Sequence, residues 1–339
     1  MDTISKLPSR SIFEVLKPSF QAFYPLLAAN ASKIKSVPRS THSYGSHARQ
    51  KCDVYQPSTK SDGSPILAFF YGGGLIRGDR ALGPPMDAMD LIYANLGAFF
   101  ALQGYTTVVG DYRRVNDRQM GTGEDATFPS GGDDMSALLT WLVDSSESPV
   151  YTAQKSTRDL FLMGNSAGGL HCATFMLYDK YLQQRQKLVK ADSLLRWKGV
   201  VLLSVPCDQD TAAPGRKVVN EAYWPLTLNG SSVEVDTAAG HAEHSFGPAG
   251  LLRKLTGSRS ELAIPAVLMA EDEFDPADEI ADSIGRFEKL WEDKFGDGMD
   301  KLWVEGHNHI SPPLALMSGE GEKWGHDVVE WMKKQSSIV

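Results

Sequence analysis

The sequence predicts an α/β fold in which a mostly parallel central sheet is covered by helices on both faces. Three observations lead to this prediction. Short apolar runs of strand length alternate with amphipathic segments of helix length along most of the chain. Several runs are apolar throughout, as in strands that are buried on both faces. Glycine, acidic residues or histidine follow several of the runs, and such sheets gather function at the carboxyl ends of their strands.

Seven segments are predicted as strands, because each is a short apolar run bounded by turn-forming or charged residues. The run at 64–74, SPILAFFYGGG, is strongly apolar and ends in three glycines, so we expect a central strand that leads into a special loop. The predicted strands are 50–57, 64–74, 106–114, 159–164, 197–206, 264–272 and 300–306.

Helical periodicity fills the intervals between these strands. The segment SGGDDMSALLTWLVD carries acidic residues in its first turn, where they interact favourably with the helix dipole. The predicted helices are 91–105, 130–144, about 165–181, about 277–295 and about 320–335.

The domain organisation is predicted to have two parts. Residues 1–50 form an N-terminal helical extension, which we expect Pro18 and Pro25 to interrupt. Residues 51–339 form the main domain. Within it, the pattern weakens at about 207–250, where Gly, Pro, Ser and Asn are frequent, and a long irregular segment of this kind is typical of a lid or cap insertion.

Composition excludes several classes of protein. The net charge of -8 and the pI of about 5.5 leave no basic face to neutralise phosphates, so we expect no nucleic-acid partner. The three cysteines are too few and too widely spaced for a disulfide framework or a CxxC metal site. No run approaches the roughly 18 apolar residues that span a bilayer, and the first 20 residues lack the apolar core of a signal peptide. We therefore expect no membrane span and a cytoplasmic location.

A possible nucleophile lies between a predicted strand and a predicted helix. Gly164-Asn165-Ser166-Ala167-Gly168 fits the pattern G-x-S-x-G, in which a sharp turn exposes the serine hydroxyl above the sheet. The helix that follows directs backbone N–H groups toward the same place. The alternative is a tight turn that needs small residues and has no chemistry. The apolar strand before the motif and the apolar helix after it favour the nucleophile.

A neutral serine needs a base, and the base needs an acid that orients it. Downstream of Ser166, acidic residues follow one predicted strand and histidines follow the next. For the acid we prefer Asp275, which precedes a proline, over Asp272. For the base we prefer His309, just before a predicted N-cap at Ser311, over His307.

Acyl transfer also needs hydrogen-bond donors for an oxyanion. The N–H group of Ala167, directly after the serine, is one candidate donor, and the loop Gly72-Gly73-Gly74 supplies others. A phosphate-binding loop is the alternative for the glycines. We reject it because neither GxxxxGK[ST] nor a GxGxxG with its partner acid is present.

At these residues the chain resembles the α/β-hydrolase superfamily, in its esterase/lipase branch, near hormone-sensitive-lipase-like and feruloyl-esterase-like carboxylesterases. The resemblance implies Ser166 as nucleophile, Asp275 as acid and His309 as base, with Gly73, Gly74 and Ala167 as oxyanion donors. It covers most of the chain from about residue 50, in the motifs DVYQP, FFYGGGLIRGDR, VVGDYRR, FPSGGDD, MGNSAGG, EFDPADE and EGHNHIS.

Two residues depart from the pattern of the family. Tyr71 occupies the place of the usual histidine before the glycines, and Asn165 that of a frequent aspartate. Neither change removes a catalytic group. Tyr71 either braces the glycine loop, places a phenol near the acyl pocket, or only packs.

The function predicted from these residues is hydrolysis of small-molecule carboxylic esters through an acyl-enzyme, without cofactor or metal. A transacylase, lactonase, amidase or natural-product tailoring hydrolase could use the same residues, and a non-catalytic binding protein could use the same scaffold. Monomer and homodimer both stay open. We expect three aromatic residues of the predicted lid, together with residues 1–50, to shape the substrate pocket. His241, Glu243 and His244 form a short polar cluster, which we interpret as part of a loop and not as a metal site. The three aromatic residues are Tyr223, Trp224 and Phe246.

Overall fold

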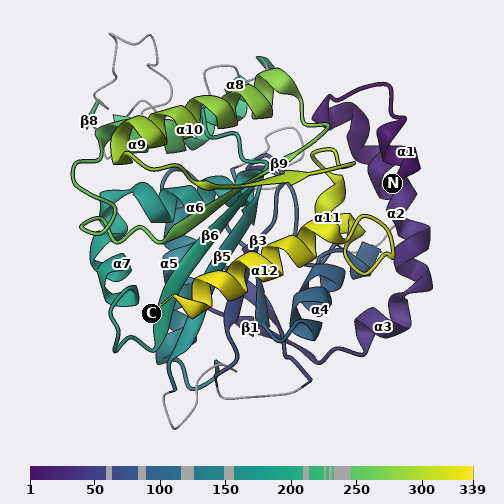
Figure 1. The fold of residues 1–339 in the computed structure, drawn as a ribbon, viewed down its shortest axis with the longest axis horizontal. Helices are drawn as coiled ribbons and strands as arrows, with labels where there is room; N and C mark the ends of the chain where they lie inside the picture. Colours follow the sequence, from purple (N-terminus) through teal and green to yellow (C-terminus); the bar gives the residue numbers. More distant parts are fainter. Residues whose placement is uncertain are drawn as a thin grey trace.

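A central sheet organises the molecule (Figure 1). The computed structural model describes residues 1–58, 63–82, 89–115, 126–148, 156–208, 214–224, 227–228, 231–232 and 246–338. Within these residues, eight strands form one sheet in the order β1-β2-β4-β3-β5-β6-β9-β10. Their bounds are β1 Arg39–Ser43, β2 Lys51–Tyr55, β3 Ile66–Phe70, β4 Thr106–Gly110, β5 Arg158–Asn165, β6 Leu195–Leu203, β9 Ala266–Asp272 and β10 Asp300–Val304.

The sheet is mostly parallel. The six strands β4, β3, β5, β6, β9 and β10 run parallel to one another, whereas β2 is antiparallel to both β1 and β4. This confirms the predicted fold class, and each of the seven predicted strands is present. Strand β1 was not predicted, because its sequence RSTHS has no apolar residue and no residue of this edge strand is fully buried.

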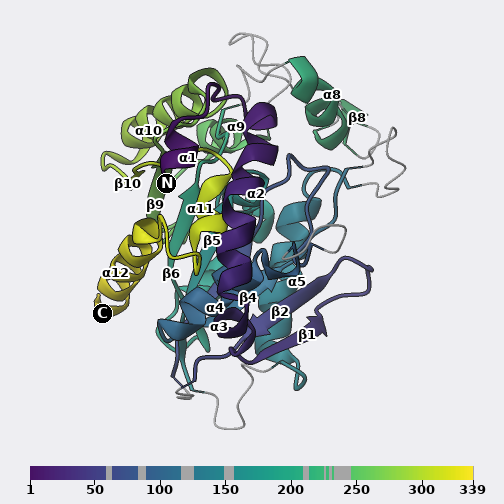
Figure 2. The same cartoon turned by 90° about the vertical axis from the view of Figure 1, so that its right-hand side faces the viewer.

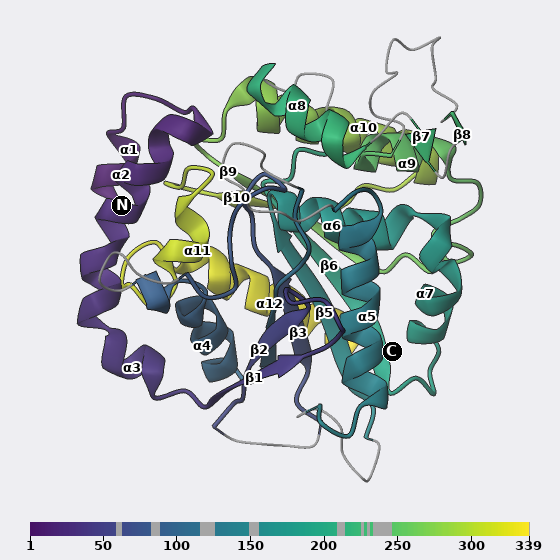
Figure 3. The ribbon, with the colours of Figure 1, turned by 180° about the vertical axis from the view of Figure 1, so that it is seen from behind.

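Helices cover both faces of the sheet. Helices α4 (Ala94–Leu102) and α12 (Lys323–Ser337) lie on one face, and α5 (Ser130–Asp144) and α6 (Ala167–Leu177) lie on the other (Figures 1 and 3). The remaining helices lie around this core. They are α1 Asp2–Ser5, α2 Ile12–Ala29, α3 Ala31–Lys35, α7 Leu182–Leu188, α8 Pro214–Tyr223, α9 Pro248–Lys254, α10 Asp282–Phe295 and α11 Ser311–Ala315, with a short π-helical turn at Ala277–Ala281 before α10.

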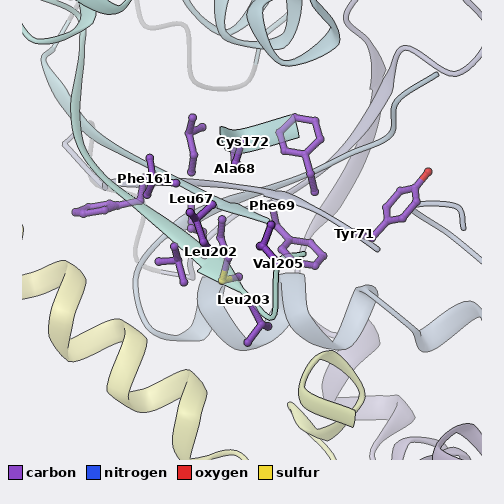
Figure 4. Packing of buried hydrophobic residues seen from close by; sticks show 14 of the residues in the cluster. Leu67, Ala68, Phe69, Tyr71, Phe161, Cys172, Leu202, Leu203 and Val205 are labelled. Atoms are coloured by element: carbon purple, nitrogen blue, oxygen red, sulfur yellow. The ribbon is translucent and has the colours of Figure 1, made fainter. Parts of the chain in front are cut away.

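The core is fully buried where α6 packs on the end of β3. Every residue of both elements is buried, because β3 lies in the middle of the sheet and α6 lies directly on it. Figure 4 shows side chains from β3, β5, β6 and α6 interleaved there. A Cβ atom on Gly168 would lie 2.1 Å from the carbonyl oxygen of Phe70, so only glycine permits this approach of helix to strand.

Helix α2 runs unbroken through Pro18 and Pro25, and the predicted interruption was wrong (Figure 2). The reason is tertiary packing. Val15, Ser19, Phe23 and Leu27 recur every four residues and are all buried, so one stripe of the helix is anchored along its length. Such packing offsets the hydrogen bonds that the prolines remove.

The segment predicted to be irregular, 207–250, contains α8, the start of α9 and a two-stranded ladder. The ladder pairs Thr227–Leu228 with Ser231–Ser232. Much of the rest of the segment, including His241, Glu243 and His244, lies outside the described residues. That the segment acts as a lid stays a prediction.

Candidate active site

Ser166 occupies a strained turn between β5 and α6. Strand β5 ends at Asn165 and α6 begins at Ala167, which leaves the serine with φ 52° and ψ -119°. A non-glycine residue rarely adopts this conformation, and strain of this kind is typical of functional turns. The Ser166 N–H group donates to the Leu203 carbonyl (2.9 Å), which fixes the turn against β6. The turn therefore has the strand–turn–helix context that the motif requires.

His309 and Asp275 complete a hydrogen-bonded chain with this serine. The Ser166 hydroxyl donates to His309 Nε2 (2.9 Å), and His309 Nδ1 donates to Asp275 Oδ1 (2.8 Å). An ionised carboxylate can only accept hydrogen bonds, so the ring proton resides on Nδ1 and leaves Nε2 free to accept. All three side chains are buried. The structure thus brings together the three residues that sequence analysis preferred.

The two rival residues have other surroundings. His307 bonds Ser311 Oγ through Nδ1 (2.9 Å) and donates from Nε2 to the Gly321 carbonyl (2.9 Å), and burial lowers its pKa to about 4. The Asp272 carboxylate has no hydrogen-bond partner among the described residues. Its pKa is raised well above the ordinary value, first by burial and then by the charge of Asp275. Neither rival bonds the serine.

The loop that carries His309 is held from below by α2. The Asn308 side chain and the Ser19 hydroxyl bond each other (3.0 Å), although 289 residues separate them. Asn308 Oδ1 also accepts from the backbone N–H groups of Ile310 and Ser311, both at 3.1 Å. Ser311 is the first residue of α11 and Ile310 is its N-cap, so the predicted N-cap at Ser311 was wrong. Its hydroxyl serves the loop instead, where it accepts from the Asn308 N–H group (3.1 Å).

The glycine loop after β3 passes directly beside Ser166. A Cβ atom on Gly72 would lie 3.1 Å from the Ser166 Cβ. Gly73 and Gly74 have φ values of 140° and 61°, which glycine adopts without strain. Within the described ranges, the backbone hydrogen bonds outside regular elements do not use the N–H groups of Gly73, Gly74 or Ala167. These groups are therefore available to a ligand.

Tyr71, at the start of this loop, is buried in a polar network that the sequence did not reveal. Arg49 Nη2 donates to the Tyr71 hydroxyl (2.8 Å) and to Asp111 Oδ1 (2.6 Å), and the Tyr71 hydroxyl itself bonds Asp111. Arg49 Nη2 also donates to the carbonyl of Gly78 beyond the loop (3.1 Å). Burial raises the pKa of Asp111 to about 6, although Arg49 opposes the shift.

The ring of Tyr71 has a packing role as well. It stacks on Tyr93 and Tyr112, with centroids 5.3 and 4.8 Å away. In Figure 4 it lies at the edge of the core cluster with its hydroxyl pointing away from the aliphatic side chains. Of the three roles considered for Tyr71, bracing and packing both agree with these contacts.

The aromatic residues of the predicted lid pack on one another and on residues in or next to α5 and α6. Phe246 lies 4.8 Å from Phe128 between ring centroids, and Tyr223 lies 5.1 Å from Trp224. The Tyr223 hydroxyl accepts from the Gly131 N–H group (3.3 Å). That these rings also shape the substrate pocket stays a prediction.

Among the residues that the structure describes, no three His, Cys, Asp or Glu side chains group as a metal ion would need. No helix among these residues is both long enough and apolar enough to cross a membrane.

Comparison with known proteins agrees with the fold. Residues 52–217 match the BD-FAE family model. Over these residues, just under half of the chain, the protein is similar to that esterase family. Three solved esterase structures share its fold. They are esterase B from Lactobacillus rhamnosis (14% identity, TM-score 0.57, 95% of each chain covered), an esterase from Pseudomonas putida (18%, 0.54, 98% of this chain and 89% of that one) and one from the archaeon Pyrobaculum calidifontis (16%, 0.57, 97% and 99%). No curated protein sequence matches significantly.

The family match covers only part of the candidate site. Residues 52–217 include the glycine loop and Ser166 but neither Asp275 nor His309. These two residues join the site through the fold, because β9 pairs with β6 and β10 pairs with β9, and these parallel strands end at the same edge of the sheet.

Proposed function

We propose that this protein is an esterase that cleaves carboxylic esters by serine catalysis, through an acyl-enzyme intermediate. The observation that carries the proposal is the chain of hydrogen bonds from Ser166 through His309 to Asp275. The glycine loop beside the serine adds backbone N–H groups that are free for an oxyanion. A nucleophile, a base oriented by an acid, and oxyanion donors are together what acyl transfer needs.

In the first half-reaction, His309 Nε2 takes the proton of Ser166 Oγ as the oxygen attacks the ester carbonyl. The carbonyl oxygen becomes an oxyanion, which we assign to the N–H groups of Gly73, Gly74 and Ala167. Asp275 stabilises the imidazolium that forms. The C–O bond to the alcohol then breaks, His309 returns the proton to the departing oxygen, and the acyl group stays on Ser166.

In the second half-reaction, water replaces the alcohol. His309 takes a proton from the water, whose oxygen attacks the acyl carbonyl, and the same N–H groups hold the second oxyanion. The bond to Ser166 Oγ breaks, the serine recovers its proton from His309, and the carboxylic acid leaves. Every step uses residues of this chain and water.

Short-chain esters are the natural first substrates to test. A solved structure of the Lactobacillus rhamnosis enzyme carries a tributyrin phosphonate inhibitor, and at 15% identity it shares the fold of this chain. We extend the substrate class, small carboxylic esters, to this chain as part of the proposal.

The test compares Ser166→Ala with the wild type on p-nitrophenyl butyrate. Loss of the nucleophile should lower kcat by about 10⁴-fold or more while the thermal unfolding curve stays close to that of the wild type. Ser36→Ala, at an exposed serine remote from the site, is the control and should keep full activity. A fluorophosphonate probe should label the wild type and not Ser166→Ala. Wild-type turnover by Ser166→Ala would refute the proposal.

A further inference from the structure

A guanidinium group lies over the glycine loop. Arg216, in the first turns of α8, places Nη1 3.8 Å from the position that a Cβ atom on Gly74 would occupy. Apart from the chain neighbours of Gly74, no other heavy atom of the described residues comes within 4 Å of that position. As far as the described residues go, the space beside Gly74 is thus bordered by Arg216 and otherwise open. In Figures 1 and 3, α8 lies beyond the central sheet, across the top of the molecule.

The same guanidinium is anchored on its other side. Arg216 Nε donates to Glu279 Oε2 (2.6 Å), and Glu279 lies four residues after Asp275. The Arg216 side chain is 29% exposed and that of Glu279 is 18% exposed. A single arginine thus lies between the loop of the proposed oxyanion donors and the helical turn that follows the proposed acid.

The ion pair with Glu279 uses only some of the N–H donors of Arg216. A guanidinium has five N–H donors in a planar fork, and Glu279 engages the donor at Nε. The nitrogen that faces Gly74 is on the opposite side from that contact. A partly exposed ion pair contributes little to stability. The contact with Glu279 instead fixes the direction in which the remaining donors point.

Resting on the proposed esterase function, we propose that Arg216 binds a carboxylate of the substrate, so that the enzyme selects esters that carry a carboxylate near the scissile bond. A planar fork that is partly withdrawn from water suits a carboxylate, which it can bind through two parallel hydrogen bonds. The neighbouring negative charge of Asp275 is engaged by His309. The carboxylate can belong to the acyl part or to the alcohol part of the ester, and the test separates the two.

Two matched pairs of substrates distinguish these cases. p-Nitrophenyl hemisuccinate carries its carboxylate on the acyl part and is compared with neutral p-nitrophenyl butyrate. 4-Acetoxybenzoate carries its carboxylate on the alcohol part and is compared with neutral 4-acetoxybenzamide. For each pair we define the selectivity as the ratio of kcat/KM for the anionic ester to kcat/KM for the neutral one, measured at neutral pH.

The arginine is tested by Arg216→Gln, with Lys217→Gln as the matched control. Both variants remove one positive charge from the same turn of α8, and Lys217 is exposed. Losing a hydrogen bond to a charged group typically lowers affinity by about ten- to a hundredfold. We expect Arg216→Gln to lower the selectivity in one substrate pair by at least about tenfold, mostly through KM, and Lys217→Gln to keep it within about twofold. Arg216→Lys should restore part of the loss, since it keeps the charge but not the fork.

Each outcome decides the proposal. Unchanged selectivity in Arg216→Gln for both substrate pairs would overturn the proposal. An equal loss of selectivity in Lys217→Gln would also overturn it, because it would indicate a general electrostatic effect of positive charge on α8. An equal loss for anionic and neutral esters would assign Arg216 a structural role and also overturn it. The proposed esterase function fails separately, if the wild type hydrolyses none of the four esters.

Discussion

The close approach of α6 to β3 makes Gly168→Ala the sharpest test of how the nucleophile is positioned. The new methyl carbon would lie 2.1 Å from the Phe70 carbonyl oxygen, 2.5 Å from the Phe70 carbonyl carbon and 2.6 Å from the Tyr71 carbonyl oxygen. Ordinary contacts begin at 3.4 Å. All three atoms belong to the backbone, so no side-chain rotation can make room. The start of α6 and the end of β3 must move apart by about 1 Å.

The size of the effect follows from that displacement. Overpacking a dense core typically costs about 1–3 kcal/mol, and we expect about 3 kcal/mol here because the backbone itself has to move. With an unfolding entropy of about 2.1 cal/mol/K per residue, this corresponds to a fall in Tm of about 4 °C for a chain of 339 residues. Ser166 and the glycine loop lie on the two elements that separate. A misplacement of about 1 Å can lower the rate about a hundredfold.

The assay is kcat/KM on p-nitrophenyl butyrate together with calorimetric Tm. Gly285→Ala is the control, because it lies in α10 and a Cβ atom there would meet nothing within 4 Å. Alanine in an open helical position should stabilise by about 0.5–1 kcal/mol and leave kcat/KM unchanged. A Gly168→Ala variant with wild-type Tm and kcat/KM would refute the packing argument. A lowered Tm with wild-type kcat/KM would refute the link between this contact and the site.

Three further predictions concern buried polar groups. Asp272→Asn should raise Tm at neutral and alkaline pH but have little effect near pH 4. The reason is that a carboxyl whose pKa is raised in the folded state makes the protein less stable as pH rises above the pKa of the unfolded state. An equal effect at all pH values would contradict this. Tyr71→Phe should lower stability by about 1–3 kcal/mol and kcat on p-nitrophenyl butyrate as well, since Asp111 loses a donor and the glycine loop a brace; unchanged unfolding and kcat would contradict it. His171 and His307, whose pKa values burial lowers to about 3 and about 4, should make the protein less stable as pH falls below about 6.5, because the unfolded chain takes up protons that the folded chain does not. When the free energy of unfolding is measured with urea at several pH values between pH 4 and pH 7, its dependence on pH should be weaker in His307→Gln than in the wild type. An unchanged dependence on pH would exclude His307 as a source of this loss of stability.

The sheet could be predicted because its strands carry their own signal. Strands such as β3, buried on both faces, must be apolar throughout, and that requirement is visible in the sequence. Strand β1 carries no such signal, because its place at the edge of the sheet is set by pairing with β2. The unbroken course of α2 was missed for a related reason, since local rules for proline do not register a buried stripe.

The residues of the candidate site divide in the same way. Ser166 could be predicted from the residues next to it in the sequence, and the fold places the acid and then the histidine after it along the chain. The choice of Asp275 over Asp272, however, depends on which carboxylate reaches His309, and only the structure shows that. The network of Arg49, Tyr71 and Asp111 joins residues 22 to 62 positions apart, so no local pattern contains it.

The bond between Ser19 and Asn308 has a consequence for when the protein becomes active during synthesis and folding. The ribosome synthesises Ser19, in α2, 289 residues before Asn308, in the loop that carries His309. Helix α2 therefore exists in the growing chain long before the loop that it stabilises. Until then the chain displays a serine with no base beside it. Contacts of such separation form late in folding. Ester hydrolysis should therefore appear only after the core has assembled, and the onset of turnover during refolding becomes a clock for the last long-range docking event.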